Sequence, residues 1–467
     1  MRRLRPRTAL VVIVSVGAAL RIACAAYAAR TPVGLHDPGF YRLLADGLAH
    51  GHGYSLPPPF NPPGVGFTPT AYYPPLYPAL LGALQWTALH SPLPDRMNGW
   101  VVALNVVASV AAIVLVYDIA RRIADIRTAL VASAIVALWP NLVLHAATTL
   151  SETVFIAVML FAVWLAVAGS WSAISWLRLV AVGAVVGVAT LVRPVALPLV
   201  VAFAIAWLVA GVAWRTVLGR SALVVLSCAA VVAPWVVRNA AVMDAAVLST
   251  NTGDNLCMSR QPGANGAFQL TAYCNEVDPS LHRPESEVKQ NDENKHKAIT
   301  FIRDHPATEV RLWFSRLRFG FGNDADGLRA VESYEDDRFL PDWLRTTITV
   351  TANLWFAVVG LLALGSLPWW LRRRDPGAWL IASAAVGVGV LPIVAFFGDP
   401  RFHVPMAPFL AILAAGVVTG WAWRPRSAPR GRRAAPEASK APTMLARMAT
   451  ASARTVALVR AVPTVRP

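Results

Sequence analysis

Long apolar runs are the feature of this sequence that most restricts its fold. Apolar residues make up 56% of the 467 residues and charged residues only 15%, against about 25% in an ordinary soluble domain. The hydrocarbon core of a bilayer is crossed by about 20 helical residues. The sequence therefore predicts an all-α polytopic membrane protein with about ten transmembrane helices. The runs lie at 8–29, 98–119, 128–146, 152–169, 178–192, 195–213, 221–237, 347–371, 378–397 and 404–423.

The apolar stretch from Trp176 to Trp214 is too long for one span, and Arg193-Pro194 interrupts it near its middle. An unpaired arginine at the centre of a bilayer costs at least about 2.5–3.5 kcal/mol. Two spans joined by a turn place Arg193 at a membrane surface instead. The sequence therefore predicts a helical hairpin at this position.

Basic residues in short loops indicate which ends of the spans face the cytoplasm. With about ten spans, the basic segments fall on one side, so both termini are predicted to be cytoplasmic. These segments are the N-terminal MRRLRPR, residues 121–127, Arg178, residues 215–220, residues 372–374 and the chain after Trp423. A cleaved signal peptide ending at Ala26-Tyr27-Ala28 is the alternative for the first run, but its apolar stretch of about 22 residues favours an uncleaved span.

This topology predicts four regions. Residues 1–237 form an N-terminal membrane module of about seven spans, with a first outer loop at 30–97. Residues 238–346 form a small extracytoplasmic α-rich region, 347–423 a C-terminal module of about three spans, and 424–467 a disordered basic cytoplasmic tail.

Two local patterns stand out in the outer regions. In PGFYRLLADGLAHG, Tyr41, Leu44, Ala45 and Leu48 recur at helical spacing, which predicts an amphipathic helix on the membrane surface or at the mouth of a cavity. In the region 238–346, Cys257 and Cys274 are the two cysteines. An oxidising compartment would allow them to pair, and the sequence alone leaves the pairing open.

A few ionisable residues stand at the outer ends of the predicted spans, unaccompanied by a nucleotide-binding, nucleophile-elbow or Cys/His metal motif. They are Asp37, Glu152, Arg193, Arg238, Arg401 and His403. A carboxylate there can take a proton from an attacking hydroxyl, and cations can stabilise a phosphate leaving group. Sugar transfer from a lipid phosphate to an outer acceptor needs these groups.

We assign catalysis to Asp37 and Glu152 as a hypothesis. Contact with the donor phosphate or sugar is assigned to Arg193, Arg238, Arg401, His403, Tyr41, Tyr72 and Tyr73. Structural alternatives stand beside these roles: a helix cap for Asp37, support of its span for Glu152, snorkelling for Arg193 and Arg238, and a pair with Asp399 for Arg401. For Tyr72 and Tyr73 the alternative is an interfacial aromatic belt, which the sequence favours slightly.

Six segments occur in a recognisable order: HDPGFYRLLADGLAHGHGYS, YYPPLYPALLGAL, LSETVF, TLVRP, APWVVRN with LSTNTGDNL, and GDPRFHVPMAPFLAILAAG. Together they resemble the GT-C superfamily of membrane glycosyltransferases. The sequence is most similar to the bacterial branch related to family 39 protein mannosyltransferases and lipid A aminoarabinose transferases. The resemblance implies a polyprenyl-phosphate sugar donor, an extracytoplasmic active site at a bacterial inner membrane, inversion at the anomeric carbon, and Asp37 as the base.

The expected function is therefore transfer of a monosaccharide to a cell-envelope glycan, glycolipid or protein. Pro38 follows Asp37 where protein mannosyltransferases have a glutamate, which argues against a protein acceptor. No second carboxylate beside Asp37 supports a divalent metal, and no nucleic-acid partner is expected because the tail lacks aromatic residues for base stacking.

The leading alternative is a membrane transporter or lipid flippase, which would place polar groups near the bilayer midplane and often has internal repeats. A third possibility is an envelope assembly protein that has kept the fold and lost the activity.

Overall fold

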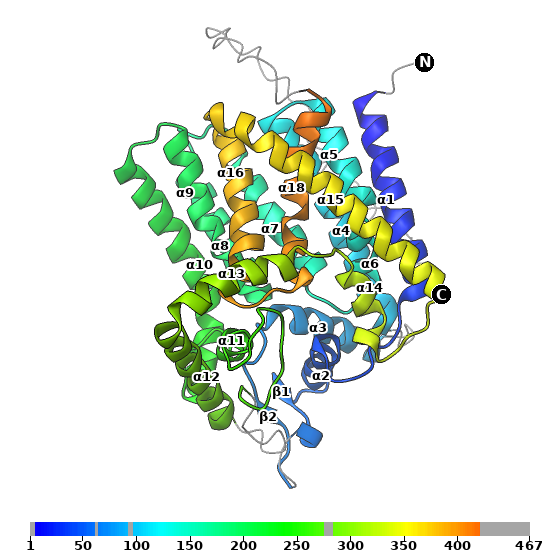
Figure 1. Cartoon of the computed structure of the whole chain (residues 1–467), viewed down its shortest axis with the longest axis vertical. Helices are drawn as coiled ribbons and strands as arrows, with labels where there is room; N and C mark the ends of the chain where they lie inside the picture. The colour runs from blue at the N-terminus through cyan, green and yellow to red at the C-terminus, as the bar shows by residue number, and fades with distance from the viewer. Residues whose placement is uncertain (1–4, 61–63, 92–96, 275–283, 421–467) are drawn as a thin grey trace, which may run out of the picture. The chain divides into compact units, whose positions relative to one another are not determined.

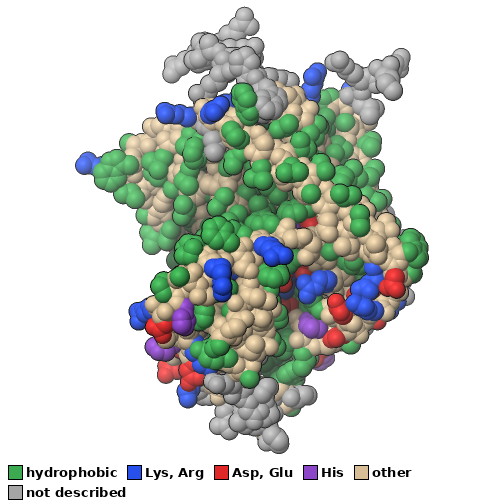
Figure 2. All heavy atoms as spheres, viewed as in Figure 1, with side chains coloured by type: hydrophobic (Ala, Val, Ile, Leu, Met, Phe, Trp, Pro, Cys, Tyr) green, Lys and Arg blue, Asp and Glu red, His purple; other side chains and the backbone are tan. Residues whose placement is uncertain are grey.

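Among the residues that the structure describes, the protein is mainly helical, with one short two-stranded sheet (Figure 1). A computed structural model describes residues 5–60, 64–91, 97–274 and 284–420. The predicted tail at 424–467 lies outside these residues. Figure 2 shows a mostly hydrophobic flank along the long helices, whereas charged side chains gather over the end that contains α11, α12 and α14.

Each of the ten runs predicted to span the membrane coincides with a helical segment. Within the described residues, six of these segments are long and apolar enough to cross a bilayer. They are α1 (Pro6–Ala28), α4 (Met97–Ile123), α10 (Trp214–Met243), α15 (Asp342–Arg372), the consecutive α16 (Pro376–Ala385), η6 (Val386–Val390) and α17 (Leu391–Ala395), and the consecutive η7 (Pro400–Met406) and α18 (Ala407–Val418).

The remaining predicted spans are bent or short. Helix α5 (Ile126–Leu138) meets α6 (Pro140–Leu144) and η2 (His145–Ala147) at a bend of 58°. Three further apolar segments have 10–17 residues, fewer than a perpendicular crossing requires. They are α7 (Glu152–Ala166), α8 (Trp176–Val192), and η3 (Pro194–Ala196) with α9 (Leu199–Val209).

The bend after α5 interrupts the helical hydrogen bonds, because Pro140 has no N–H to donate, and the carbonyl oxygen of Val136 keeps only a 3.4 Å contact with the Trp139 amide. Arg21, in the middle of the first apolar run, supplies the missing donors. Its guanidinium donates to the carbonyl oxygens of Val136 and Ala137 at 3.1 and 2.9 Å. A fully buried arginine inside a predicted span is thus accounted for by backbone groups that the bend exposes.

The break predicted at Arg193-Pro194 is present. Helix α8 ends at Val192, Arg193 has extended backbone angles, and α9 begins at Leu199. After the turn, α9 packs against α16 and α10, while α8 packs against α7 and α10.

Close packing of α8 against α10 depends on two glycines one turn apart. A Cβ at Gly183 would lie 2.4 Å from the carbonyl oxygen of Val224, and one at Gly187 would lie 2.9 Å from that of Cys228. Small residues at this spacing let two helix backbones approach closely inside a membrane. The α8–α10 pair therefore depends on the absence of side chains at these positions.

The first outer loop contains the predicted amphipathic helix, α2 (Asp37–Ala49), followed by β1 (Ser55–Leu56), η1 (Pro58–Phe60), β2 (Thr68–Pro69) and α3 (Leu76–Leu89). Strands β1 and β2 are antiparallel. Tyr41, Leu44 and Ala45 of α2 are buried, and α2 packs against α3. The apolar face of α2 is therefore covered by protein.

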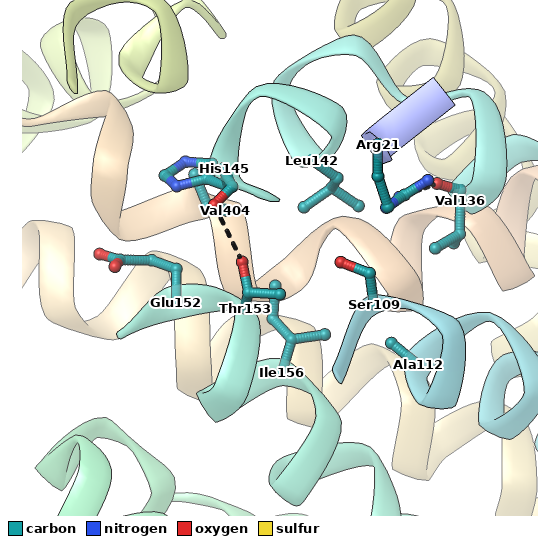
Figure 3. Close-up of a pocket in the computed structure, with 10 residues that line it drawn as sticks. All are labelled: Arg21, Ser109, Ala112, Val136, Leu142, His145, Glu152, Thr153, Ile156 and Val404. Atoms are coloured by element: carbon teal, nitrogen blue, oxygen red, sulfur yellow. Dashed lines mark hydrogen bonds between the residues drawn. The ribbon is translucent and has the colours of Figure 1, made fainter. Parts of the chain in front are cut away.

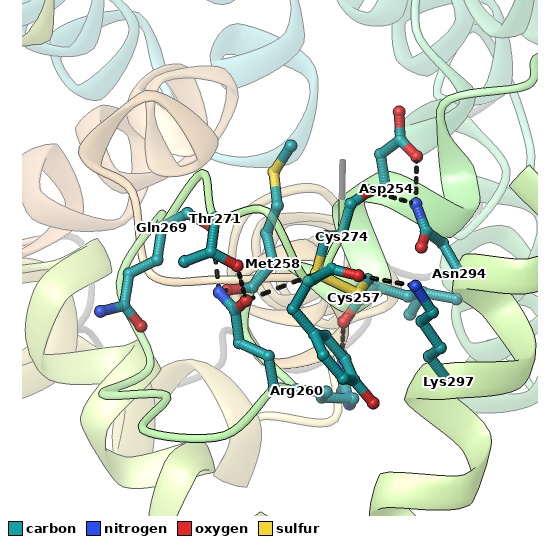
Figure 4. The surroundings of a disulfide bond; sticks show 12 residues. Asp254, Cys257, Met258, Arg260, Gln269, Thr271, Cys274, Asn294 and Lys297 are labelled. Carbon is teal, nitrogen blue, oxygen red and sulfur yellow. Dashed lines mark hydrogen bonds between the residues drawn. A yellow bond between two sulfur atoms is a disulfide. The ribbon is translucent and has the colours of Figure 1, made fainter. Parts of the chain in front are cut away.

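The second outer region begins after α10, whose helix runs six residues beyond the predicted boundary at 237. It contains α11 (Thr252–Cys257), α12 (Pro284–Asp304), α13 (Pro306–Gly320), α14 (Asp326–Val331) and η5 (Ser333–Glu335). Cys257 and Cys274 form a disulfide (Figure 4). The buried carboxylate of Glu287 in α12 accepts hydrogen bonds from Thr70, the Ala71 amide and Thr250, and so joins the two outer regions.

We expect Gly183→Ala to lower the free energy of unfolding by about 1–3 kcal/mol, because the new methyl group must push α10 away. Thermal unfolding of the purified protein in detergent measures the change. Gly219→Ala in α10 is the matched control, since nothing lies within 4 Å of the added Cβ. Equal unfolding midpoints for the two variants would contradict the role of Gly183.

Candidate functional site

Four charged side chains from distant parts of the chain meet at one place. Arg401 of η7 donates to both Asp37, the first residue of α2, and Glu152, the first residue of α7. Arg193, at the turn after α8, also donates to Glu152. The structure thus brings together the two carboxylates and two of the arginines that the sequence singled out, and we call these four residues the ion cluster.

Local sequence places each member at the end of a helical segment. Pro38 occupies the first turn of α2, where proline is tolerated, and Pro194 ends the helix at Arg193. The Asp399 carboxylate accepts a hydrogen bond from the Arg401 amide at 2.8 Å, which fixes the start of η7. The pairing of Asp399 is therefore with the backbone of Arg401, and the Arg401 side chain is left for the ion cluster.

Exposure differs across the ion cluster. The Glu152 side chain is fully buried, those of Arg193 and Arg401 are 13% and 14% exposed, and that of Asp37 is 32% exposed. Asp37 is thus the carboxylate that a substrate can reach, whereas Glu152 lies beneath the arginines and orients them.

Tyr73 completes the surroundings of Asp37. Its hydroxyl donates to Asp37 Oδ1 at 2.6 Å, while Arg401 donates to Oδ2. Burial and the charge of Asp37 hold the pKa of Tyr73 well above its ordinary value, so this hydroxyl keeps its proton and remains a donor. The Tyr41 ring meets that of Tyr73 edge-on with 4.9 Å between centroids, and burial raises the pKa of Tyr41 to about 12.

Tyr72 faces the second outer region. Burial, followed by the charge of Asp254 and a hydrogen bond to it, raises the pKa of Tyr72 well above its ordinary value. Asp254 also accepts from Asn294, whose amide reaches the carbonyl oxygen of Cys274 at 2.8 Å (Figure 4). Tyr72 therefore connects the first outer loop to the disulfide-bonded segment.

Arg238 and His403 lie apart from the ion cluster. Arg238 donates to the carbonyl oxygens of Tyr54 and Thr70, both at 2.8 Å, and so holds the first outer loop. His403 is fully buried. Its ring nitrogens lie 2.7 Å from the carbonyl oxygen of Gly320 and 2.9 Å from Asp324 Oδ1.

Three residues near the ion cluster were not identified from the sequence: Asp324, Asp326 and His145. Asp324 accepts hydrogen bonds from Trp139 and Asn141, in addition to its contact with His403, and so fixes the segment that carries Arg401. The acidic pair Asp324 and Asp326 is a weak signal among the 17 acidic residues of 238–346. His145 lies within a predicted span and gave no signal.

A small cavity lies behind Glu152, with room for about one water molecule. Arg21, Ser109, His145, Glu152 and Thr153 supply its polar lining (Figure 3). Within the described residues, no group of three or more His, Cys, Asp or Glu side chains is arranged to hold a metal ion.

The comparisons with known proteins support the helical membrane fold. Residues 87–237 match the family of dolichyl-phosphate-mannose-protein mannosyltransferases. A comparison with curated protein sequences finds no match.

Among solved structures, the chain is similar to the oligosaccharyltransferase of Archaeoglobus fulgidus. The complex with zinc and sulfate has a TM-score of 0.51 at 16% identity, covering 88% of this chain and 49% of that one. The form tethered to an acceptor peptide gives 0.53 at 15% identity, covering 90% and 50%. ArnT from Cupriavidus metallidurans in the apo state gives 0.48 at 14% identity, covering 90% and 60%.

The helical fold and the ion cluster are typical of a polytopic membrane protein that has a polar site at one end of its helices. Residues 87–237 resemble the dolichyl-phosphate-mannose-protein mannosyltransferase family, and the fold is similar to that of the archaeal oligosaccharyltransferase. It spans about half the length of the oligosaccharyltransferase that it matches.

We expect Arg401→Met to lower the free energy of unfolding by about 3 kcal/mol, because it removes one cation from a buried carboxylate. Adding Glu152→Gln to Arg401→Met should restore part of the loss, since the buried negative charge is then gone. Thermal unfolding measures both changes.

Arg338→Met is the control, because the pair between Arg338 and Glu335 is 53% and 64% exposed and such pairs contribute less than about 1 kcal/mol. A double variant no more stable than Arg401→Met alone would argue against charge pairing as the source of the loss.

Proposed function

We propose that the protein transfers a monosaccharide from a polyprenyl-phosphate-linked donor to an acceptor hydroxyl at the outer membrane surface. Asp37 acts as the general base. The observation that supports this most directly is its position: an accessible carboxylate beside two arginines, where base and phosphate-binding groups are both needed.

The proposed transfer reaction has the acceptor hydroxyl beside Asp37 and the donor phosphate beside the arginines. The acceptor oxygen attacks the anomeric carbon, and its proton passes to Asp37. The bond between the anomeric carbon and the phosphate oxygen breaks, and its electron pair leaves with the phosphate. Attack on the face opposite the departing phosphate inverts the anomeric configuration.

Arg193 is the best placed residue to receive the phosphate. Its Nη1 donates to Glu152 and Ser151, whereas within the described residues its Nε and Nη2 donate to no protein group. Its guanidinium can therefore bind an anion through Nε and Nη2 without losing the contact with Glu152. Arg401 would stabilise the same charge as it develops in the transition state.

The family match, which concerns dolichyl-phosphate-mannose, supports the proposed donor class. The distribution of basic residues supports the proposed orientation. We propose a bacterial cell membrane, with cytoplasmic termini and the ion cluster on the opposite side. A cell-envelope glycan, glycolipid or protein is the acceptor.

A transporter or flippase is the alternative function. It is less well supported because the ion cluster joins the outer ends of helices to an outer loop, and such proteins bind substrate near the bilayer midplane.

We expect Asp37→Asn to reduce sugar transfer at least about a hundredfold, because the acceptor proton then has no base. The assay supplies membranes with radiolabelled polyprenyl-phosphate sugars. Asp46→Asn is the matched control, since Asp46 lies on the same helix with a side chain 54% exposed, away from the ion cluster. If the Asp37→Asn variant is present at normal abundance and transfers sugar at the wild-type rate, the proposed mechanism is wrong.

A further inference from the structure

Asp326 and His145 form an unusual pair beside the ion cluster. Asp326 is the first residue of α14, His145 is the first residue of η2, and both side chains are about 1% exposed. His145 Nε2 lies 3.7 Å from Asp326 Oδ2, beyond hydrogen-bond distance. Within the described residues, neither ring nitrogen and neither carboxylate oxygen has a hydrogen-bond partner.

Buried polar groups are nearly always hydrogen-bonded, and an ionised carboxylate without partners is costly to bury. A carboxyl group that holds a proton is neutral and is buried at far lower cost. Burial and the charge of Asp399 raise the pKa of Asp326 to about 7. Asp326 therefore changes charge near neutral pH, unlike an ordinary aspartate.

The position of Asp326 is fixed by close backbone packing. The Gly327 amide donates to Asn141 Oδ1 at 2.8 Å, and a Cβ at Gly327 would lie 2.8 Å from that of Leu144. The start of α14 is thus pressed against α6, directly beside His145. His145 also borders the cavity that reaches Glu152 (Figure 3).

Charged and titratable groups act on Asp326 from several elements around α14, although α6, which packs on α14, carries none. Besides His145 of η2, they are Asp399 and Arg401 at η7, Glu152 of α7, Tyr334 of η5 and Arg329 of α14 itself. The charged residues at the start of α15 are engaged elsewhere, because Arg345 pairs with Glu332 and Asp342. Arg401 is therefore the cation shared between Asp326 and the ion cluster.

We propose that Asp326 and His145 form a buried proton-holding site that controls how strongly the ion cluster binds an anionic lipid donor. While Asp326 is protonated, Arg401 pairs with two carboxylates, those of Asp37 and Glu152. When the proton is lost, a third carboxylate acts on the same guanidinium and opposes the approach of a phosphate. Donor binding therefore weakens as the pH rises through neutrality. The inference rests on the proposed phosphate contact at Arg193 and Arg401.

The test measures binding of the methyl phosphodiester of a short polyprenol to the full-length protein in detergent. A diester lacks the second phosphate ionisation near pH 6, so its own charge stays constant. For the wild-type protein we expect the dissociation constant to rise on the order of tenfold between about pH 6 and pH 8, the effect of one added charge at an intermediate dielectric. Asp326→Asn should bind tightly and equally across this range.

Two further variants make the result decisive. Asp342→Asn, at a fully exposed carboxylate, should keep the wild-type pH dependence. His145→Ala should move the midpoint to lower pH, because water entering the space solvates the Asp326 carboxylate.

Wild-type binding that does not change with pH, or a midpoint unmoved in His145→Ala, overturns the proton-holding site and leaves the proposed function standing. Absence of binding at every pH overturns the phosphate contact and the inference with it.

Discussion

The guanidinium of Arg401 connects two carboxylates that lie 115 residues apart in the sequence, at the start of α2 and the start of α7. Because Glu152 is fully buried and Arg401 nearly so, a charge left alone there would be strongly destabilising. The first outer loop, the start of α7, the turn after α8 and the start of η7 must therefore meet. This requirement fixes the accessible carboxylate, Asp37, against the helix ends that carry Glu152, Arg193 and Arg401.

The residues around the ion cluster reinforce the same arrangement. Asp324 ties His403 to α6, and so holds the segment of Arg401. Arg238 and Glu287 fasten the first outer loop to α10 and α12. Arg238 and His403, which the sequence placed among the candidate site residues, thus hold neighbouring segments in place. Such support is what a site needs in order to hold its groups in a productive geometry.

The sequence predicted much of the site because the topology places certain charges on one surface. Asp37, Glu152, Arg193 and Arg401 were selected in this way, and they do meet. Arg238 and His403 satisfied the same criterion, yet their side chains turn to backbone carbonyls and to Asp324. His145 and Asp326 were missed, since one lies inside an apolar run and the other among many acidic residues. The direction of a side chain, and the lack of a hydrogen-bond partner for a buried side chain, leave no pattern in the neighbouring sequence.

The sequence by itself determined the helices, their breaks and the amphipathic face of α2, because hydropathy, helical spacing and proline act over a few neighbouring residues. Tertiary structure alone decided which charges touch, that α9 packs on α16 and α10, that Cys257 and Cys274 pair, and that Asp326 is left unpartnered beside His145. These features depend on distances through space between remote segments and on the exclusion of water between them. Both arise only when the whole chain is packed.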